Sequence, residues 1–415
     1  MDFSNDWMDE FKLRFSLGQT GNAASGASLY LGSYASGDNY MDMSAITPST
    51  MQLNRLKWET TTEYNTGLDA SFLKGKLRFT VDVYQKYIKD LLQKKVKMPT
   101  SIGYGNGYEV SYMNSGKMTN KGWEFRVDAV PFENRDWRVG FYFNIAHNEN
   151  KITEMPDNYT EENYTFNNGE YAYRREEGRP MGSFYGYRYK GVCQNKDATY
   201  ARDADGNVMK DISGNAIVMR YGTATIAPGD ALYEDINHDG VINQYDIVYL
   251  GNSNPRFTGG AGVNVSYKQF KLSAIFYGRY GQDVVNSTRL NNESMRGIDN
   301  QSTAVLRRWR NEGDQTDIPR ALYGEGYNTL GSDRFVEDAS YLRLKSLSFN
   351  YRLPKKIIQR WGFSNIDVYV TGYNLFTWTK YTGQDPEVKT ENTYARDSAT
   401  TPASIQLVAG FNLSF

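Results

Sequence analysis

The sequence has almost no cysteine or histidine, and this shortage excludes several kinds of site. Cys193 is the only cysteine among 415 residues, so an intrachain disulfide framework is impossible. The two histidines, His147 and His238, lie far apart in the sequence, which leaves no credible histidine-based triad or zinc cluster. The acidic residues are scattered, so they define no glycosidase pair. The sequence therefore offers no catalytic residue, and we expect no enzyme.

Charge of one sign and long apolar runs are also missing. Lys and Arg number 47 against 48 Asp and Glu, a net charge of −1, which indicates neither a nucleic-acid partner nor an acidic disordered tail. No apolar run is long enough for a membrane-spanning helix. The first residues lack the basic and apolar regions of a signal peptide. If the protein is exported, we expect its natural start to lie upstream.

Aromatic residues, in contrast, are abundant: 33 Tyr, 20 Phe and 7 Trp. Outer-membrane barrels concentrate such residues in girdles at the two membrane interfaces. Soluble β-sandwiches and carbohydrate-binding proteins also use many tyrosines, so composition alone leaves these classes open.

Alternation of apolar and polar residues predicts long strands. In residues 404–415, Ile405, Leu407, Ala409, Phe411, Leu413 and Phe415 alternate with polar or small residues. A period of two is the pattern of an extended strand. Similar segments occur at 11–17, 56–72, 77–92, 123–129, 137–145, 257–267, 270–276, 341–353 and 366–378. A change of phase within 341–353 predicts a β-bulge near Lys345 and Ser346.

The connections alternate between short and long. Short turns are predicted at 73–76, 131–136, 268–269 and 354–365, and the long segments include 19–54, 94–118 and 153–255. We predict helical turns at 3–9 and 303–310, and we assign 184–189 to an outer hairpin. Short turns alternating with long loops are typical of outer-membrane barrels. The predicted fold class is therefore all-β: an antiparallel transmembrane β-barrel segment of about ten long strands with long extracellular loops.

One loop has the spacing of a calcium site. Oxygen-bearing positions 1, 3, 5, 7, 9 and 12 of an EF-hand loop correspond to Asp235, Asn237, Asp239, Val241, Asn243 and Asp246, and Gly240 occupies the sharp turn. Hard oxygen ligands suit Ca²⁺. The alternative is a turn that uses the same side chains for local hydrogen bonds and binds no metal.

Other side chains could line a transport path. Loop aromatics that could stack on sugar rings are Tyr185, Tyr187, Tyr189, Trp309 and Tyr381, although aromatic packing among the loops is the better explanation for any single one of them. Charges on the polar strand faces (Arg78, Asp82, Arg126 and Arg279) are more typical of a structural ion network than of a selectivity ring.

Several motifs together resemble SusC/RagA-type TonB-dependent transporters. They are the segments 228–243 and 251–258, Leu-Lys-Trp-Glu-Thr-Thr at 56–61, 114–122, Ser-Tyr-Leu-Arg-Leu-Lys at 340–345, 374–381, Asp385-Pro-Glu387 and the terminal Phe415. They occur in the family's order over nearly the whole chain. The resemblance implies that residues 1–415 are the C-terminal part of a 22-stranded outer-membrane barrel. Residues 153–256 would form a long extracellular loop region, and the plug, the TonB box and the signal peptide would be absent.

The resemblance also implies partners and a location. Such a transporter imports oligosaccharides or peptides across the outer membrane of a Gram-negative bacterium. It works with a SusD-like surface lipoprotein and is energised by TonB through its N-terminal part. Phe411, Leu413 and Phe415 resemble the signal that the barrel assembly machinery recognises. The alternatives are a passive porin or structural barrel, and a soluble secreted carbohydrate-binding β-protein.

Overall fold

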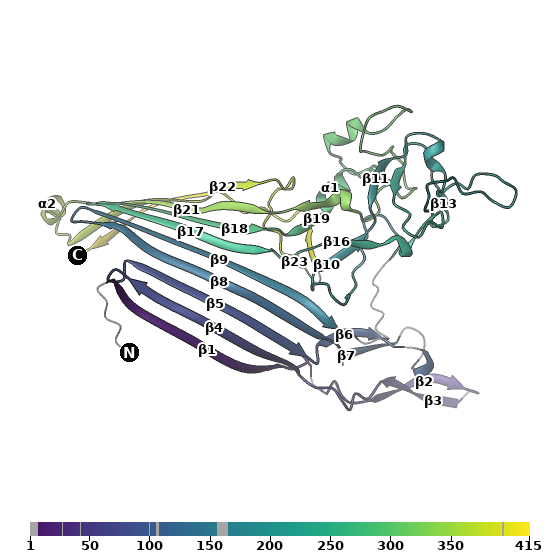
Figure 1. Cartoon of the computed structure of the whole chain (residues 1–415), viewed down its shortest axis with the longest axis horizontal. Helices are drawn as coiled ribbons and strands as arrows, with labels where there is room; N and C mark the ends of the chain where they lie inside the picture. Colours follow the sequence, from purple (N-terminus) through teal and green to yellow (C-terminus); the bar gives the residue numbers. More distant parts are fainter. Residues whose placement is uncertain are drawn as a thin grey trace.

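A single large antiparallel sheet organises the chain. The computed structural model describes residues 7–26, 28–41, 43–98, 100–104, 108–155, 165–391 and 394–415. Ten long strands lie side by side in chain order (Figure 1). They are β1 (Met8–Asn22), β4 (Glu59–Phe72), β5 (Leu77–Lys89), β8 (Lys117–Glu133), β9 (Trp137–Glu154), β17 (Phe257–Tyr267), β18 (Phe270–Tyr280), β21 (Tyr341–Arg352), β22 (Asn365–Thr379) and β25 (Gln406–Ser414).

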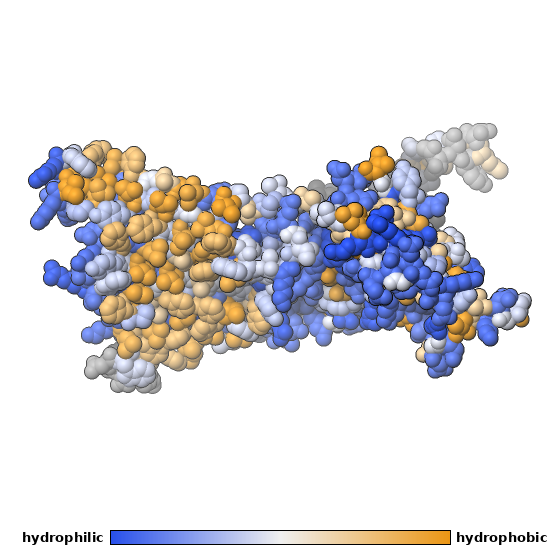
Figure 2. All heavy atoms as spheres, turned by 90° about the horizontal axis from the view of Figure 1, so that it is seen from above, coloured by the Kyte–Doolittle hydropathy of each residue, from blue (hydrophilic) through white to orange (hydrophobic). Residues whose placement is uncertain are grey.

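The strand register separates an apolar face from a polar face. One row across the sheet contains Leu13, Leu68, Val81, Phe125, Ile145, Gly259, Gly278, Leu342 and Trp378. The next row contains Lys12, Asp69, Thr80, Arg126, Asn144, Gly260, Tyr277, Arg343 and Thr377. Because side chains alternate across a pleated sheet, adjacent rows point to opposite faces. Figure 2 shows apolar surface gathered over the strand half of the molecule and mostly hydrophilic surface over the other half.

Aromatic residues mark both ends of the apolar face. At the short-turn end, Trp137 and Tyr267 have ring centroids 4.3 Å apart. At the other end, Phe276 and Trp378 have ring centroids 6.4 Å apart. A strand of 11 residues such as β17, tilted as barrel strands are, covers roughly 25 to 30 Å. This height is that of the apolar band on a membrane barrel.

The short connections lie at one end of the sheet and the long ones at the other. Turns at 73–76, 134–136 and 268–269 join neighbouring strands directly, and α2 (Lys355–Ile358) with the 3₁₀ helix η6 (Gln359–Trp361) joins β21 to β22. The start of β1, α2 and the C-terminus lie together at the left end in Figure 1. None of the helices in the described ranges is long and apolar enough to cross a membrane.

The long connections contain short strands and helical turns at the right end in Figure 1. The strands are β2 (Ser33–Tyr40), β3 (Met43–Thr50), β6 (Leu92–Lys97), β7 (Glu109–Asn114), β10 (Ser183–Gly186), β11 (Tyr189–Val192), β12 (Arg220–Tyr221), β13 (Ala224–Thr225), β14 (Ala231–Tyr233), β15 (Val241–Ile242), β16 (Val248–Asn252), β19 (Asp283–Asn286), β20 (Val336–Asp338), β23 (Thr390–Glu391) and β24 (Tyr394–Asp397). The helices are α1 (Ser287–Asn292) and the 3₁₀ turns η1 (Thr100–Ile102), η2 (Asp197–Thr199), η3 (Gln244–Asp246), η4 (Thr303–Arg307) and η5 (Asp333–Phe335).

Most strand predictions are confirmed. The ten long strands and the four short connections are present, and the register shifts between Leu344 and Ser346, where the bulge was predicted. The segment 184–189 lies outside the large sheet, as predicted, but it does not form a hairpin. Instead, β10 pairs with β16 and β11 pairs with β14.

Some local predictions are wrong. The segments 19–54 and 94–118 are not simply loops, because β1 extends to Asn22 and because β2 pairs with β3 and β6 with β7. The helix predicted at 303–310 is only a 3₁₀ turn ending at Arg307. The helical turn predicted at 3–9 lies partly outside the described residues, and its last two residues begin β1.

Candidate functional site

The polar face of the sheet carries paired charges. The Arg14 guanidinium donates to both oxygens of Asp69, at 2.7 and 3.1 Å, and to both oxygens of Asp82, at 2.9 and 3.0 Å. Arg126 donates to both oxygens of Asp128, at 2.7 and 2.8 Å. Paired forks of this kind fix side-chain geometry. Of the four charges predicted to form a structural ion network, Asp82 and Arg126 make two separate ion pairs, and Arg279 donates instead to the Tyr277 hydroxyl at 3.1 Å.

Four glycines on the polar face are covered by side chains of the neighbouring strand. A Cβ added to Gly262 would lie 2.0 Å from Tyr142 Cε1, and one added to Gly410 would lie 2.6 Å from the Tyr369 hydroxyl. Gly122 and Gly67 are covered in the same way, by Tyr84 and Arg14. The large side chains thus lie along the wall instead of projecting from it.

The long loop between β9 and β17 has a core of its own. Tyr233 lies at its centre, with ring centroids 5.7 Å from Tyr187, 6.0 Å from Tyr189 and 5.6 Å from Tyr221. The Tyr233 hydroxyl accepts from the Leu330 amide and donates to the Tyr327 carbonyl. This core therefore joins the β9–β17 loop to the β18–β21 loop.

Three of the five predicted stacking aromatics are buried. Tyr185 and Tyr187 have no exposed surface, and Tyr381 has 6 %. Tyr185 donates to Glu176, Tyr187 to the Asn243 carbonyl, and Tyr381 to Asp397. Their expected role as exposed stacking surfaces is wrong in this conformation, because packing and hydrogen bonds use both ring and hydroxyl.

Tyr189 and Trp309 are only half-buried, and for these two residues ligand stacking stays a prediction. Burial raises the pKa of Tyr189 to about 12, so its hydroxyl stays protonated and donates to the Asp317 carbonyl at 2.7 Å. Trp309 lies over Gly229, where an added Cβ would be 2.3 Å from the indole ring.

The EF-hand-like loop is closed by its own side chains. Asp235 accepts from the amides of Asp239 and Gly240, and Asp239 accepts from the amide of Val241. The buried Asp246 carboxylate accepts from Ile236 and Asn243, each at 2.8 Å. Burial raises the pKa of Asp246.

The contacts of the EF-hand-like loop suit a calcium ion only in part. The donor types and their spacing suit Ca²⁺, and the turns hold the first three side chains in place. However, Asn243 Nδ2 donates to the Val241 carbonyl and Asn237 Nδ2 to Asp239, so two of the oxygens already have donors. Among the described residues, no group of three His, Cys, Asp or Glu side chains is arranged for a metal ion. The calcium site therefore stays a prediction.

A second charge cluster fixes the last loop. Arg343, whose side chain is 3 % exposed, donates to Asp385 at 2.5 Å and to Glu387 at 2.9 Å. Lys345 also binds Glu387, at 2.8 Å. Arg343 and the Asp-Pro-Glu sequence belong to two motifs noted in the sequence, and the structure brings them together. Beyond the presence of both motifs, nothing in the sequence indicates this pairing.

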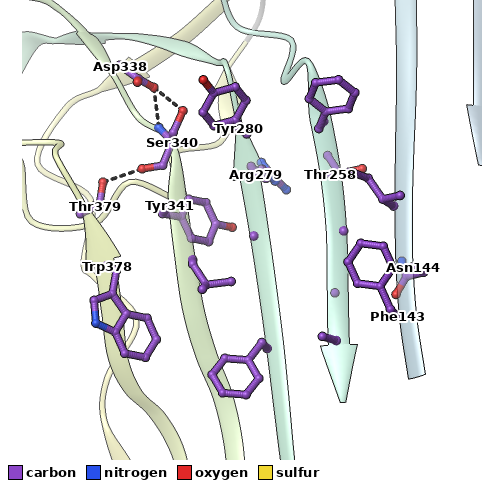
Figure 3. A pocket seen from close by; sticks show the side chains of 18 of the residues that line it. Phe143, Asn144, Thr258, Arg279, Tyr280, Asp338, Ser340, Tyr341, Trp378 and Thr379 are labelled. Carbon is purple, nitrogen blue, oxygen red and sulfur yellow. Dashed lines mark hydrogen bonds between the residues drawn. The ribbon is translucent and has the colours of Figure 1, made fainter. Parts of the chain in front are cut away.

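A groove of about 650 Å³ lies on the apolar face near the loop end. Figure 3 shows Phe143, Tyr280 and Trp378 around it. Gly259 and Gly278 are paired at its floor. A Cβ on Gly259 would lie 2.5 Å from the Asn144 carbonyl oxygen, and one on Gly278 would lie 2.8 Å from that of Tyr341. The backbone of the neighbouring strand therefore leaves room only for glycine at these two positions.

Together, an apolar band between aromatic girdles, a polar opposite face and loops at one end define a membrane β-barrel wall. Residues 2–375 match the family described as TonB dependent receptor-like, beta-barrel. The chain therefore belongs to the TonB-dependent receptor β-barrel family, whose members are outer-membrane transporters and not enzymes. This membership overturns the alternative of a soluble secreted β-protein.

Individual relatives agree with this assignment. TonB-dependent receptor P3 of Formosa agariphila is 31 % identical over 397 residues, which cover 92 % of this chain and 36 % of the relative. TonB-dependent receptor SusC of Bacteroides thetaiotaomicron is 27 % identical over 98 % of this chain and 38 % of SusC. The structure of the RagAB peptide transporter matches with a TM-score of 0.75 and 26 % identity, covering all of this chain and 42 % of the matched chain. The chain thus spans less than half the length of these relatives.

Proposed function

We propose that this chain forms part of an active outer-membrane importer of oligosaccharides or peptides. Its polar face would line the transport path, and its long loops would form part of the extracellular entrance. The observation that carries the proposal is the polar wall of paired charges and flattened tyrosines, joined at one end to a packed loop assembly. The similar RagAB system is a peptide importer, which supports peptides as one of the two substrate classes.

The proposal includes two partners. A SusD-like lipoprotein would cover the loop end, and TonB would supply energy through a plug domain. Likeness to SusC and RagA supports both partners. A passive porin is the competing function, because the same wall could line an open channel.

Uptake in cells tests the proposal. A strain lacking the gene should fail to take up one member of a panel of labelled oligosaccharides and peptides, and the restored gene should recover that uptake. Disrupting TonB or adding a protonophore should abolish the recovered uptake. Uptake that persists without TonB and without a proton gradient would indicate a passive porin. Affinity purification of the tagged protein from outer membranes should co-purify a surface lipoprotein.

A further inference from the structure

The groove on the apolar face is a depression in a surface that contacts lipid. One row of the sheet crosses the groove on four strands, from Gly259 and Gly278 at the floor to Leu342 and Trp378 at the wall. Leu342 and Trp378 are 47 % and 51 % exposed. Because the apolar band of an outer-membrane barrel faces the bilayer, the groove is continuous with the lipid contact surface.

The shape of the groove suits one hydrocarbon chain. Aromatic rings border the glycine floor, with Phe143 on one side and Phe276 and Trp378 on the other. An acyl chain lying there would contact the floor and both walls, whereas a chain on a flat part of the band would contact one surface only. Because the chain leaves one apolar medium for another, the gain comes from closer van der Waals contact with the floor and walls and not from removal from water.

The loop end of the groove is polar. Lys380, Ser340 and Asp338 line it, and Arg256 lies beyond it with its guanidinium 5.6 Å from the Phe257 ring. Asp338 accepts from the Ser340 amide at 2.8 Å. Neither Lys380 nor Arg256 has a carboxylate partner within ion-pair distance among the described residues. These two exposed cations at the loop end of the apolar face favour an anionic headgroup there.

We propose that this groove binds one acyl chain of a membrane lipid whose phosphate-bearing headgroup lies next to Lys380. This site is separate from the transport path, because it occupies the opposite face of the sheet. Its occupant comes from the surrounding bilayer and is not imported cargo.

Native mass spectrometry of the complete protein, extracted from outer membranes in a mild detergent, tests the proposal. We expect about one phosphate-bearing lipid retained per protein. Ala261→Phe should lower this retention about tenfold, because Ala261 lines the groove and a phenyl ring would fill it. Ala274→Phe is the matched control, since Ala274 lies on the same face of β18 but outside the groove, and it should retain the lipid.

Removal of the positive charge at the loop end tests the role of the headgroup. Lys380→Gln should reduce retention of phosphate-bearing lipid severalfold, whereas Lys268→Gln, in a turn at the other end of the sheet, should not. Equal retention in Ala261→Phe and Ala274→Phe, or retention only of lipids without phosphate, would overturn the proposal. Heat-modifiable gel mobility checks that each variant is folded. If Ala261→Phe fails to fold, Leu342→Trp replaces it, because a larger side chain at Leu342 narrows the groove from its wall. Substrate uptake in cells is measured separately from lipid retention. A variant that loses the lipid but still imports substrate therefore affects only the lipid proposal, and a failure of import affects only the proposed function.

Discussion

At the scale of single residues, Arg343 decides where the last loop lies. Its guanidinium is buried and bridges Asp385 and Glu387. Breaking such a buried cluster from one side leaves unpaired charge and costs about 3–5 kcal/mol. We expect Arg343→Met to expose segment 381–402 to hydrogen exchange and to proteases. Lys345→Met removes a half-exposed contact with Glu387 and should cost at most about 1 kcal/mol. Equal protection of the loop in both variants would contradict this role.

The same cluster predicts a pH dependence. Burial disfavours ionised Asp385, but amide donors from Ala403 and Glu387 and the Arg343 guanidinium outweigh it, so the pKa of Asp385 lies below its ordinary value of 3.8. A lowered folded-state pKa stabilises the loop above the unfolded-state pKa, and this stabilisation is lost as the pH falls through the folded-state value. Loop protection should therefore be constant from about pH 5 to 7 and fall below about 3.8. Hydrogen exchange of the loop amides, corrected for the pH dependence of intrinsic exchange and measured across this range, checks the prediction, and Asp385→Asn should remove this contribution.

The calcium prediction also belongs to individual side chains. We expect calcium to protect segment 231–250 from proteolysis, and Asp239→Ala to abolish most of that protection, because Asp239 occupies position 5 of the loop. Asp211→Ala is a matched control: Asp211 accepts from the Ser213 and Asn215 amides in a similar turn without the EF-hand spacing. If calcium gives the unmutated protein no protection, the loop is a hydrogen-bonded turn and not a metal site.

At the scale of strands, the packing of tyrosine over glycine predicts a specific sensitivity. Gly262→Ala should cost about 1–3 kcal/mol, because the new methyl group would overlap the Tyr142 ring and force it from the wall. Gly140→Ala, on the same face, meets nothing closer than 3.9 Å and should change the free energy of unfolding little. Urea-induced unfolding in detergent, followed by gel mobility, compares the two. Similar losses in the free energy of unfolding would show that any added methyl group on this face destabilises the sheet, whether or not a tyrosine covers the site.

The long strands could be predicted because a period of two is visible within each segment. Even the bulge was visible, since Leu342 and Leu344 differ in phase from Leu347 and Phe349. β2 and β3 pair locally but were missed because Ser33–Tyr40 shows no alternation of apolar and polar residues. The short strands with distant partners could not be predicted either: Ser183 in β10 pairs with Asn252 in β16. These strands have as few as two residues, too short for periodicity to show.

The candidate sites also divide into those built from a local sequence pattern and those built from segments that are distant in the sequence. The spacing of Asp235 to Asp246 is local and was visible in the sequence. The burial of Tyr185 and Tyr187 depends on a core assembled from several loops, so a tyrosine-rich segment could not be assigned to ligand stacking or packing. The groove was missed because its walls come from β9, β21 and β22, which reach the predicted β17–β18 hairpin only through pairing between segments that are distant in the sequence.

At the scale of the whole molecule, the sheet separates a turn end from a loop end. We propose that the loop end is extracellular, which the barrel pattern favours. The chain offers a sensitive test because its only cysteine, Cys193, is fully buried, and burial raises the pKa of its thiol to about 11. Since thiolates react and buried thiols do not, the unmutated protein should give almost no background with a maleimide.

Ile212 and Lys268 provide the two reporters. Ile212 lies fully exposed in the long loop, and Lys268 lies in the tight turn between β17 and β18. On intact cells, a membrane-impermeant maleimide should label Ile212→Cys and leave Lys268→Cys unlabelled until the outer membrane is permeabilised. The reverse pattern would place the loops in the periplasm. The polar wall would remain, but no lipoprotein at the cell surface could cover these loops, so the result would reject the lid while leaving membership of the barrel family intact.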